Sequence, residues 1–308
     1  MKFAILSDIH GNIEALASLF LNLHNNNNTI DRLLITGDIV GYGPNPNECC
    51  VIIKYLQKGH HGDKKAVETV LENIELGRDE RKVITDYIFS MGKKADVVVG
   101  NHDKEVIGQP SFVGMMSASA AKAAKWTTDA LEKDNFKFLY SLKYRKKLPR
   151  FNIELVHSTP VYPQGWEYPK NAGVLNYKTL RAKITFAGHT HNPAAYLYKN
   201  QAKNEDVTPS IFIPVDQFDN RLLVMETSSS QRIEEFDIVT NRDHKYYINP
   251  GSIGQPRDGI PKASYMIYDT DTRKIALQKA EYNTEAVKEK IIKAKLPREL
   301  ANRVIKGV

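Results

Sequence analysis

Five short apolar stretches of this chain each run into a polar segment that carries Asp, His or Asn, often beside glycine. The segments are Asp8-Ile9-His10, Gly37-Asp38, Gly100-Asn101-His102, His157 and Gly188-His189-Thr190-His191. An apolar run of this length predicts a buried strand. Because the carboxyl ends of the strands in an open α/β sheet border one crevice, we expect these distant residues to meet in one site.

Helical patterns alternate with the predicted strands. Apolar residues recur on one face of residues 12–24, and residues 47–57 show a helical pattern. The first 60 residues therefore predict an α/β layered fold. Residues 58–94 are charged and predict an inserted helical pair that faces solvent, and 117–142 predict a long amphipathic helical region.

The C-terminal half predicts a second sheet. Short β-like stretches there are 211–215, 222–226, 232–238, 245–248, 264–269 and 274–280. A helix is expected at 284–294, and another follows Pro297. With no internal repeat and no composition boundary, we predict a single domain over 1–308 with the helical insertion at about 58–94.

Composition limits the class of protein. The 308 residues are 42% hydrophobic and 26% charged, which is ordinary for a globular protein. The sequence contains no run of about 18 apolar residues, so we expect no membrane span. The two cysteines, Cys49 and Cys50, are adjacent, so we expect no disulfide framework and a cytoplasmic location. They also make a thiolate zinc site unexpected. The net charge of +7 favours anionic ligands without specifying one.

The polar segments together form a plausible ligand set for metals. Two carboxylates, one amide oxygen and four imidazoles are offered by Asp8, His10, Asp38, Asn101, His157, His189 and His191. Mixed oxygen and nitrogen ligands suit Mn, Fe, Zn, Co or Ni better than Ca or Mg. Residues two apart on a strand point the same way, which would align Asp8 with His10 and His189 with His191. One carboxylate, Asp38, could bridge two ions about 3.5–4 Å apart that hold a phosphoryl group and activate a water.

Each segment also has a simpler explanation. Asp-x-His is commonly a surface pair, Gly-Asp a turn, Gly-Asn-His-Asp a helix cap, and an isolated histidine such as His157 a hydrogen-bonded core residue. Five such segments in this order favour the metal site over these separate explanations.

In this order the segments resemble the blocks of the calcineurin-like metallophosphoesterases, D-x-H, G-D, G-N-H-D/E, H and G-H-x-H. Later motifs are similar to the YfcE-like and diadenosine-tetraphosphatase-related bacterial and archaeal branch, namely Asn249-Pro250-Gly251-Ser252, Ala263-Ser264-Tyr265, Glu281-Tyr282 and Leu296–Ala301. The resemblance implies an α/β fold, a four-layer αββα sandwich of two mixed sheets flanked by helices.

The resemblance also implies roles. The first of two divalent metals (Mn, Fe, Zn, Ni or Co) would take Asp8, His10, Asp38 and His191. The second would take Asp38, Asn101, His157 and His189. His102 matches the catalytic histidine that contacts the phosphate and protonates the leaving oxygen. Asn12 and Tyr42 are weaker candidates for substrate binding.

The second block departs from part of the family. Protein phosphatases and true diadenosine tetraphosphatases have G-D-x-V-D-R-G, whereas Gly41 and Tyr42 replace the Asp-Arg pair here. The Asp orients the catalytic histidine and the Arg grips the phosphate. Tyr42 could donate a hydrogen bond, stack on a base or pack within the turn. The stretch 195–222 is, like 58–94, longer than the family core, and could form a lid, an oligomer contact or polar surface.

The expected function is a binuclear metal-dependent phosphodiesterase or phosphatase that uses a metal-bridging hydroxide on a phosphoester small molecule or nucleotide. One alternative is a nuclease of the same fold. The best basic patch, Lys143–Lys147 with Arg150, lacks the interleaved aromatics of single-strand binding proteins, so nucleic acid is possible but not favoured. The other alternative is a non-catalytic metal-binding scaffold.

Overall fold

The computed structural model describes residues 1–26, 29–59, 63–109, 116–169, 175–199, 210–211, 237–241 and 243–308. The predicted strand at 222–226 lies outside these residues, as do most of 211–215 and 232–238 and much of the long stretch 195–222. Among the described residues, none of the helices combines the length and apolar character that a membrane crossing requires.

The first sheet has six strands in the order β3-β2-β1-β11-β12-β9. The strands are β1 (Lys2–Leu6), β2 (Arg32–Ile35), β3 (Ala95–Val97), β9 (Asp237–Val239), β11 (Ala263–Asp269) and β12 (Lys274–Ala280). Strands β1, β2 and β3 run parallel, whereas β11 lies antiparallel to β1 with Phe3 opposite Tyr268. The sheet is therefore mixed.

The second sheet also has six strands, in the order β4-β5-β6-β10-β7-β8. They are β4 (Arg145–Leu148), β5 (Ile153–Val156), β6 (Ile184–Phe186), β7 (Pro193–Lys199), β8 (Ser210–Ile211) and β10 (His244–Pro250). Strands β5, β6 and β10 are parallel, and β4 and β7 are antiparallel to their neighbours. Two mixed sheets flanked by helices confirm the predicted fold class.

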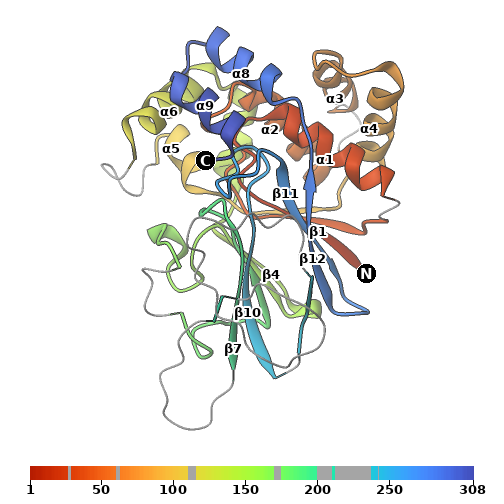
Figure 1. Cartoon of the computed structure of the whole chain (residues 1–308), viewed down its shortest axis with the longest axis vertical. Helices are drawn as coiled ribbons and strands as arrows, with labels where there is room; N and C mark the ends of the chain where they lie inside the picture. Colours follow the sequence, from red (N-terminus) through yellow and green to blue (C-terminus); the bar gives the residue numbers. More distant parts are fainter. Residues whose placement is uncertain are drawn as a thin grey trace.

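Helices gather at one end of the molecule, while β4, β7 and β10 extend away from them (Figure 1). The α-helices are α1 (Ile13–Asn25), α2 (Pro46–Lys58), α3 (Asp63–Glu72), α4 (Arg78–Ser90), α5 (Asn101–Val106), α6 (Ala118–Ala130), α7 (Lys133–Ser141), α8 (Thr284–Lys293) and α9 (Arg298–Lys306). Two 3-10 turns, at Pro149–Phe151 and Pro163–Gly165, complete the set.

Local chemistry fixes several helix ends. The Asn12 side chain accepts from the Ala15 amide and caps α1, and Pro46 occupies the first turn of α2, where no amide donor is needed. Gly59 ends α2 in the left-handed conformation that glycine adopts readily.

The core has separate layers. One apolar cluster joins the facing sides of the two sheets and includes Phe3, Ile5, Leu155 and Phe186. A larger cluster packs the other face of the first sheet under helices α1, α2 and α4. On the outer face of the second sheet, tyrosines of β7 and β10 pack against Leu175 and Leu180.

Three expectations about the elements change. The predicted helical region at 117–142 is two helices, because Leu131 and Glu132 adopt extended backbone angles between α6 and α7. The C-terminal strands do not form a sheet of their own, since β11 and β12 join the first sheet and β10 joins the second. Helices α3 and α4 bury Leu71 and Ile88 in the core, so this pair is not wholly solvent-facing. The single domain over 1–308 stays a prediction.

Candidate metal site

The five polar segments meet at the junction of both sheets, not at the edge of one. Asp8 and Asp38 follow β1 and β2, and Asn101 opens α5 just after β3, all on the first sheet. His157 follows β5 of the second sheet directly, and His189 follows β6. The loops of both sheets therefore bring the five segments together at one place.

The alternation argument for the paired residues was also wrong. Six of the eleven described non-glycine residues with positive φ lie in this site: Asp8, His10, Asp38, Tyr42, His189 and His191. They lie in loops beyond the strands, so strand periodicity cannot align their side chains. Each such conformation costs on the order of 1–3 kcal/mol and persists only where surrounding contacts impose it. Their concentration here is typical of a functional site.

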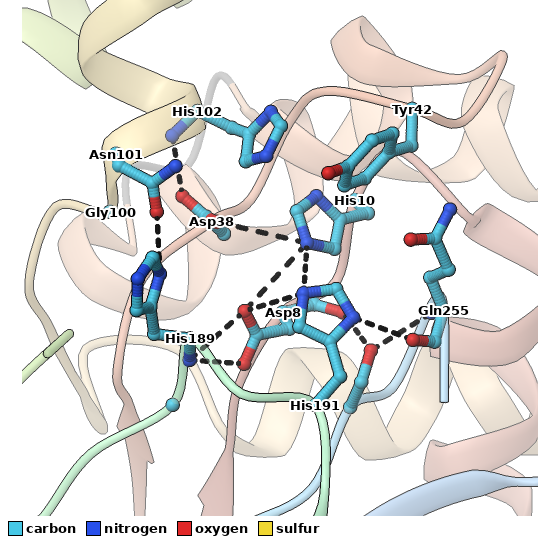
Figure 2. Close-up of polar contacts among 12 residues, drawn as sticks. Asp8, His10, Asp38, Tyr42, Gly100, Asn101, His102, His189, His191 and Gln255 are labelled. Atoms are coloured by element: carbon cyan, nitrogen blue, oxygen red, sulfur yellow. Dashed lines mark hydrogen bonds and ion pairs between the residues drawn. The ribbon is translucent and has the colours of Figure 1, made fainter. Parts of the chain in front are cut away.

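Backbone hydrogen bonds between loops impose these conformations. The amide of Asp8 donates to Gly37 O (3.1 Å), and the amide of His10 donates to Asp38 O (2.9 Å). The amide of His189 donates to the Asp8 carboxylate, 3.1 Å from Oδ2, which connects the loops of the two sheets. Figure 2 shows these side chains pointing toward one another.

One group of ligand atoms comes from Asp8, His10 and His191, which are all buried and lie within 4.8 Å of one another. Nε2 of His191 is 3.3 Å from Asp8 Oδ1, and the Nε2 atoms of His10 and His191 are 3.1 Å apart. Asp38 Oδ2 is 3.7 Å from His10 Nε2. These atoms belong to the predicted first metal.

A second group comes from Asp8, Asp38 and His157, also within 4.8 Å. His157 Nε2 is 3.2 Å from Asp38 Oδ2 and 3.0 Å from Asn101 Oδ1. His189 Nδ1 lies 2.9 Å from the same Asn101 oxygen. All seven predicted ligands thus lie together, with Asp38 facing both groups.

Backbone carbonyls orient three of the imidazoles. Nδ1 of His10 donates to Val40 O (3.1 Å), that of His157 to Thr36 O (2.8 Å) and that of His191 to Gln255 O (2.6 Å). Each bond leaves Nε2 free to face the centre of the site. This arrangement is typical of metal-binding histidines.

The charges of the site fit cations. Asp8 and Asp38 are 0% and 1% exposed, and within the described part of the chain neither is paired with a lysine or arginine. Burial alone would raise the pKa of Asp38, but the neighbouring histidines, His157 foremost, hold it well below the usual value. Burial lowers the pKa of His157, but Asp38, Asp8 and the Thr36 carbonyl together raise it to about 9. Buried anions surrounded only by imidazoles are suited to divalent metal ions.

His102 lies beside the ligands. Its amide donates to Asp38 Oδ1 (2.9 Å), and its ring is 5.0 Å from the ring of His10. A Cβ at Gly41 would lie 2.8 Å from His102 Nδ1, which is buried without a hydrogen-bond partner among the described residues. Part of the family has an Asp at the position of Gly41. In this chain no other described side chain hydrogen-bonds to His102 Nδ1 in its place.

Asp103 and Asn12 have scaffolding contacts. The carboxylate of Asp103 accepts from the amides of Ile39, Val40 and Gly100, at 2.9, 3.1 and 3.0 Å, and so fixes the loop after β2. The amide group of Asn12 caps α1 and donates to Gly254 O (2.9 Å). Its role toward substrate stays a prediction.

A cavity of about 510 Å³ opens onto the site. Its lining includes the predicted residues Asp38, Tyr42, Asn101, His102, His189 and His191, together with the unpredicted Trp166, Tyr168, Arg257 and Arg303. The Tyr168 ring stacks on His189 with centroids 4.5 Å apart and is 43% exposed. Arg257 lies seven residues beyond the end of β10, too far from the strand for the pattern that located the other segments.

The family model for calcineurin-like phosphoesterase matches residues 1–193, which contain every predicted ligand. The chain belongs to the calcineurin-like phosphoesterase family. An uncharacterized protein from Methanocaldococcus jannaschii is 33% identical over 309 residues, covering 99% of this chain and 97% of the relative. The two chains match over nearly their full lengths, and the name of the relative states no activity.

Several solved structures are similar to this chain. A metallophosphoesterase from Sphaerobacter thermophilus is 27% identical, with a TM-score of 0.65 over 100% of this chain and 99% of that one. A hypothetical protein from Pyrococcus horikoshii OT3 is 17% identical and shows the fold, with a TM-score of 0.60 over 100% and 98%. The phosphoesterase YfcE from E. coli is also among the matches, at a TM-score of 0.38.

Proposed function

We propose that this calcineurin-like phosphoesterase hydrolyses phosphoesters, as a phosphodiesterase or phosphatase, with two divalent metal ions in the described site. The observation that carries the proposal is the convergence of two buried carboxylates and four imidazoles in one site beside the cavity, with no described lysine or arginine paired with the carboxylates. Bound there, the ions would bind the phosphate as Lewis acids and lower the pKa of a bound water.

The chain would divide the ligands as the resemblance implies. Asp8, His10 and His191 would hold one ion, and Asn101, His157 and His189 would hold the other. Asp38 would contribute to both sets, since it lies near histidines of each. Either Mn, Fe, Zn, Ni or Co suits this oxygen and nitrogen set.

Chelation gives the first prediction. Dialysis against EDTA should abolish hydrolysis of bis-p-nitrophenyl phosphate, and one or more of Mn, Fe, Zn, Ni, Co and Mg should restore it, because the proposed ions supply the Lewis acid that activates water. The release of p-nitrophenol and metal content by mass spectrometry measure both effects. Full activity of metal-free protein would contradict the proposal, and bound metal without hydrolysis of any phosphoester would favour the scaffold alternative.

His102 would assist departure of the leaving oxygen. Burial lowers the pKa of its imidazole to about 3, so the ring is neutral before substrate binds. A negatively charged phosphate beside the ring would raise that pKa, so that the imidazole could take up from water the proton that it then gives to the leaving oxygen. The His102 side chain belongs to neither group of candidate ligand atoms, so its imidazole could contact the substrate.

Replacing His102 by alanine should lower kcat by roughly 100-fold or more for an alkyl ester, the usual scale for a general acid. The loss should be smaller for p-nitrophenyl esters, whose leaving group needs little protonation, and the metal content should stay near two. An equal decrease of kcat for the alkyl and p-nitrophenyl esters would contradict the role of His102 as general acid. Loss of metal would instead make His102 a ligand.

The nuclease alternative gains no support from the basic patch. Arg145 pairs with Glu154 (3.0 Å) and Lys146 with Asp96 (3.2 Å), so part of the positive charge of the patch is already neutralised.

We also propose a cytoplasmic location, since Cys49 and Cys50 are both free and buried. A phosphoester small molecule or nucleotide fits the cavity volume.

A further inference from the structure

Tyr42 occupies the position at which part of the family has a phosphate-binding arginine. Arg257, which lies 215 positions further along the chain, contacts the Tyr42 side chain. Arg257 lines the cavity together with Tyr42, His102 and His191. Its Nη2 lies 3.4 Å from the Tyr42 hydroxyl, and its guanidinium carbon is 5.9 Å from the centre of the Tyr42 ring. The Tyr42 ring is in turn 4.3 Å from that of His102.

The loop that carries Arg257 is fixed to the ligand loops. The Arg257 amide donates to His191 O (3.3 Å), and Gln255 O accepts from His191 Nδ1. Ser252 Oγ donates to Asp8 O (2.8 Å) and accepts from the Gln255 amide (2.9 Å). These contacts set the start of the Arg257 side chain relative to two predicted ligands, as Figure 2 shows for Gln255 and His191.

The charge of Arg257 is not neutralised. Its side chain hydrogen-bonds to the Tyr42 hydroxyl and to Gln255 Oε1 (3.2 Å), both neutral, and no described carboxylate forms an ion pair with it. The adjacent Asp258 pairs with Lys279 instead. Arg303, the other arginine of the cavity, is already paired with Glu299. Arg257 is only half-buried and has five N–H donors, so donors remain for an anion.

We propose that Arg257 binds a non-bridging oxygen of the substrate phosphate and so takes the role of the arginine absent from the second block. The proposal rests on the proposed function, because the phosphate must lie between Arg257 and the ligand groups. Tyr42 and Gln255 orient the guanidinium, and the ligand class is a phosphate monoester or diester whose phosphoryl oxygens face that guanidinium.

Inorganic phosphate is the probe that tests Arg257. Binding of phosphate to metal-loaded protein is measured by calorimetry, together with inhibition of bis-p-nitrophenyl phosphate hydrolysis, for wild type, Arg257→Ala and Arg257→Lys. Loss of a charge-assisted contact should weaken phosphate roughly 10- to 100-fold in Arg257→Ala. Lysine should restore part of it, because the charge remains but the planar fork does not. Metal content and Tm should not change.

Arg298→Ala is the matched control, because Arg298 is exposed on α9 and lines no part of the cavity. It should bind phosphate as wild type does. Phosphate affinity of Arg257→Ala within twofold of wild type would overturn the assignment, as would wild-type protein that binds metals but no phosphate. Absence of hydrolysis in wild type, with phosphate binding still dependent on Arg257, would instead count against the proposed function alone.

Discussion

Replacing Asp38 by asparagine is expected to lower metal-dependent phosphoester hydrolysis on the order of a thousandfold, because metal-supplied stabilisation of the transition state is several kcal/mol. Oδ2 of Asp38 lies 3.2 Å from His157 Nε2 and 3.7 Å from His10 Nε2, so its charge faces a histidine of each proposed metal set. The amide of asparagine keeps the volume and can still accept from the His102 amide through its oxygen. The substitution therefore removes charge with little change of shape.

The Asp38→Asn protein should also retain fewer than two metal ions per chain. Metal content by mass spectrometry and kcat/KM on bis-p-nitrophenyl phosphate are measured on the same samples. Asp129→Asn is the control, since Asp129 forms only an exposed ion pair with Lys125 on α6 and should leave both quantities as in wild type. Two bound ions with wild-type kcat/KM in Asp38→Asn would show that this carboxylate is not the shared ligand.

The residues that we propose as ligands could be located in the sequence because they lie just after short, strongly apolar strands. The run before Asp8 and the run before His157 are almost wholly buried, so their local pattern already encodes the strand and its end. The sequence pattern could not assign each strand to a sheet. Strands β11 and β12 carry similar local patterns to β10, and only their packing places them in different sheets.

The positive φ angles and Arg257 escaped prediction for a related reason. Asp8 and His189 adopt left-handed backbone because amides and carboxylates of other loops hold them, which no local propensity reports. Arg257 reaches Tyr42 across 215 positions of sequence through the contact of its loop with His191. Contacts that depend on two distant loops become visible only in three dimensions.

Replacing Gly100 by alanine tests whether close packing places Asp38. Gly100 has φ −104° and ψ 178°, an extended backbone that alanine adopts without strain. However, an added Cβ would lie 2.0 Å from Asp38 Oδ1 and 2.4 Å from the Asp38 amide nitrogen. Such contacts require the loop after β2 or the start of α5 to move, and overpacking of this kind costs about 1–3 kcal/mol or more.

Because the displaced group is Asp38, Gly100→Ala should combine a lower free energy of unfolding of metal-free protein, by about 2–3 kcal/mol, with loss of metal and activity. Urea unfolding and metal content measure the two effects. Gly108→Ala is the matched control, since its Cβ would meet nothing within 4 Å while its φ of +71° is unfavourable for alanine. That variant should lose about 1 kcal/mol and keep its metals. If Gly100→Ala lost stability but still bound both ions, the close approach of Gly100 to Asp38 would stabilise the fold without positioning a ligand. That result would contradict the proposal that metal binding requires Asp38 at its present position.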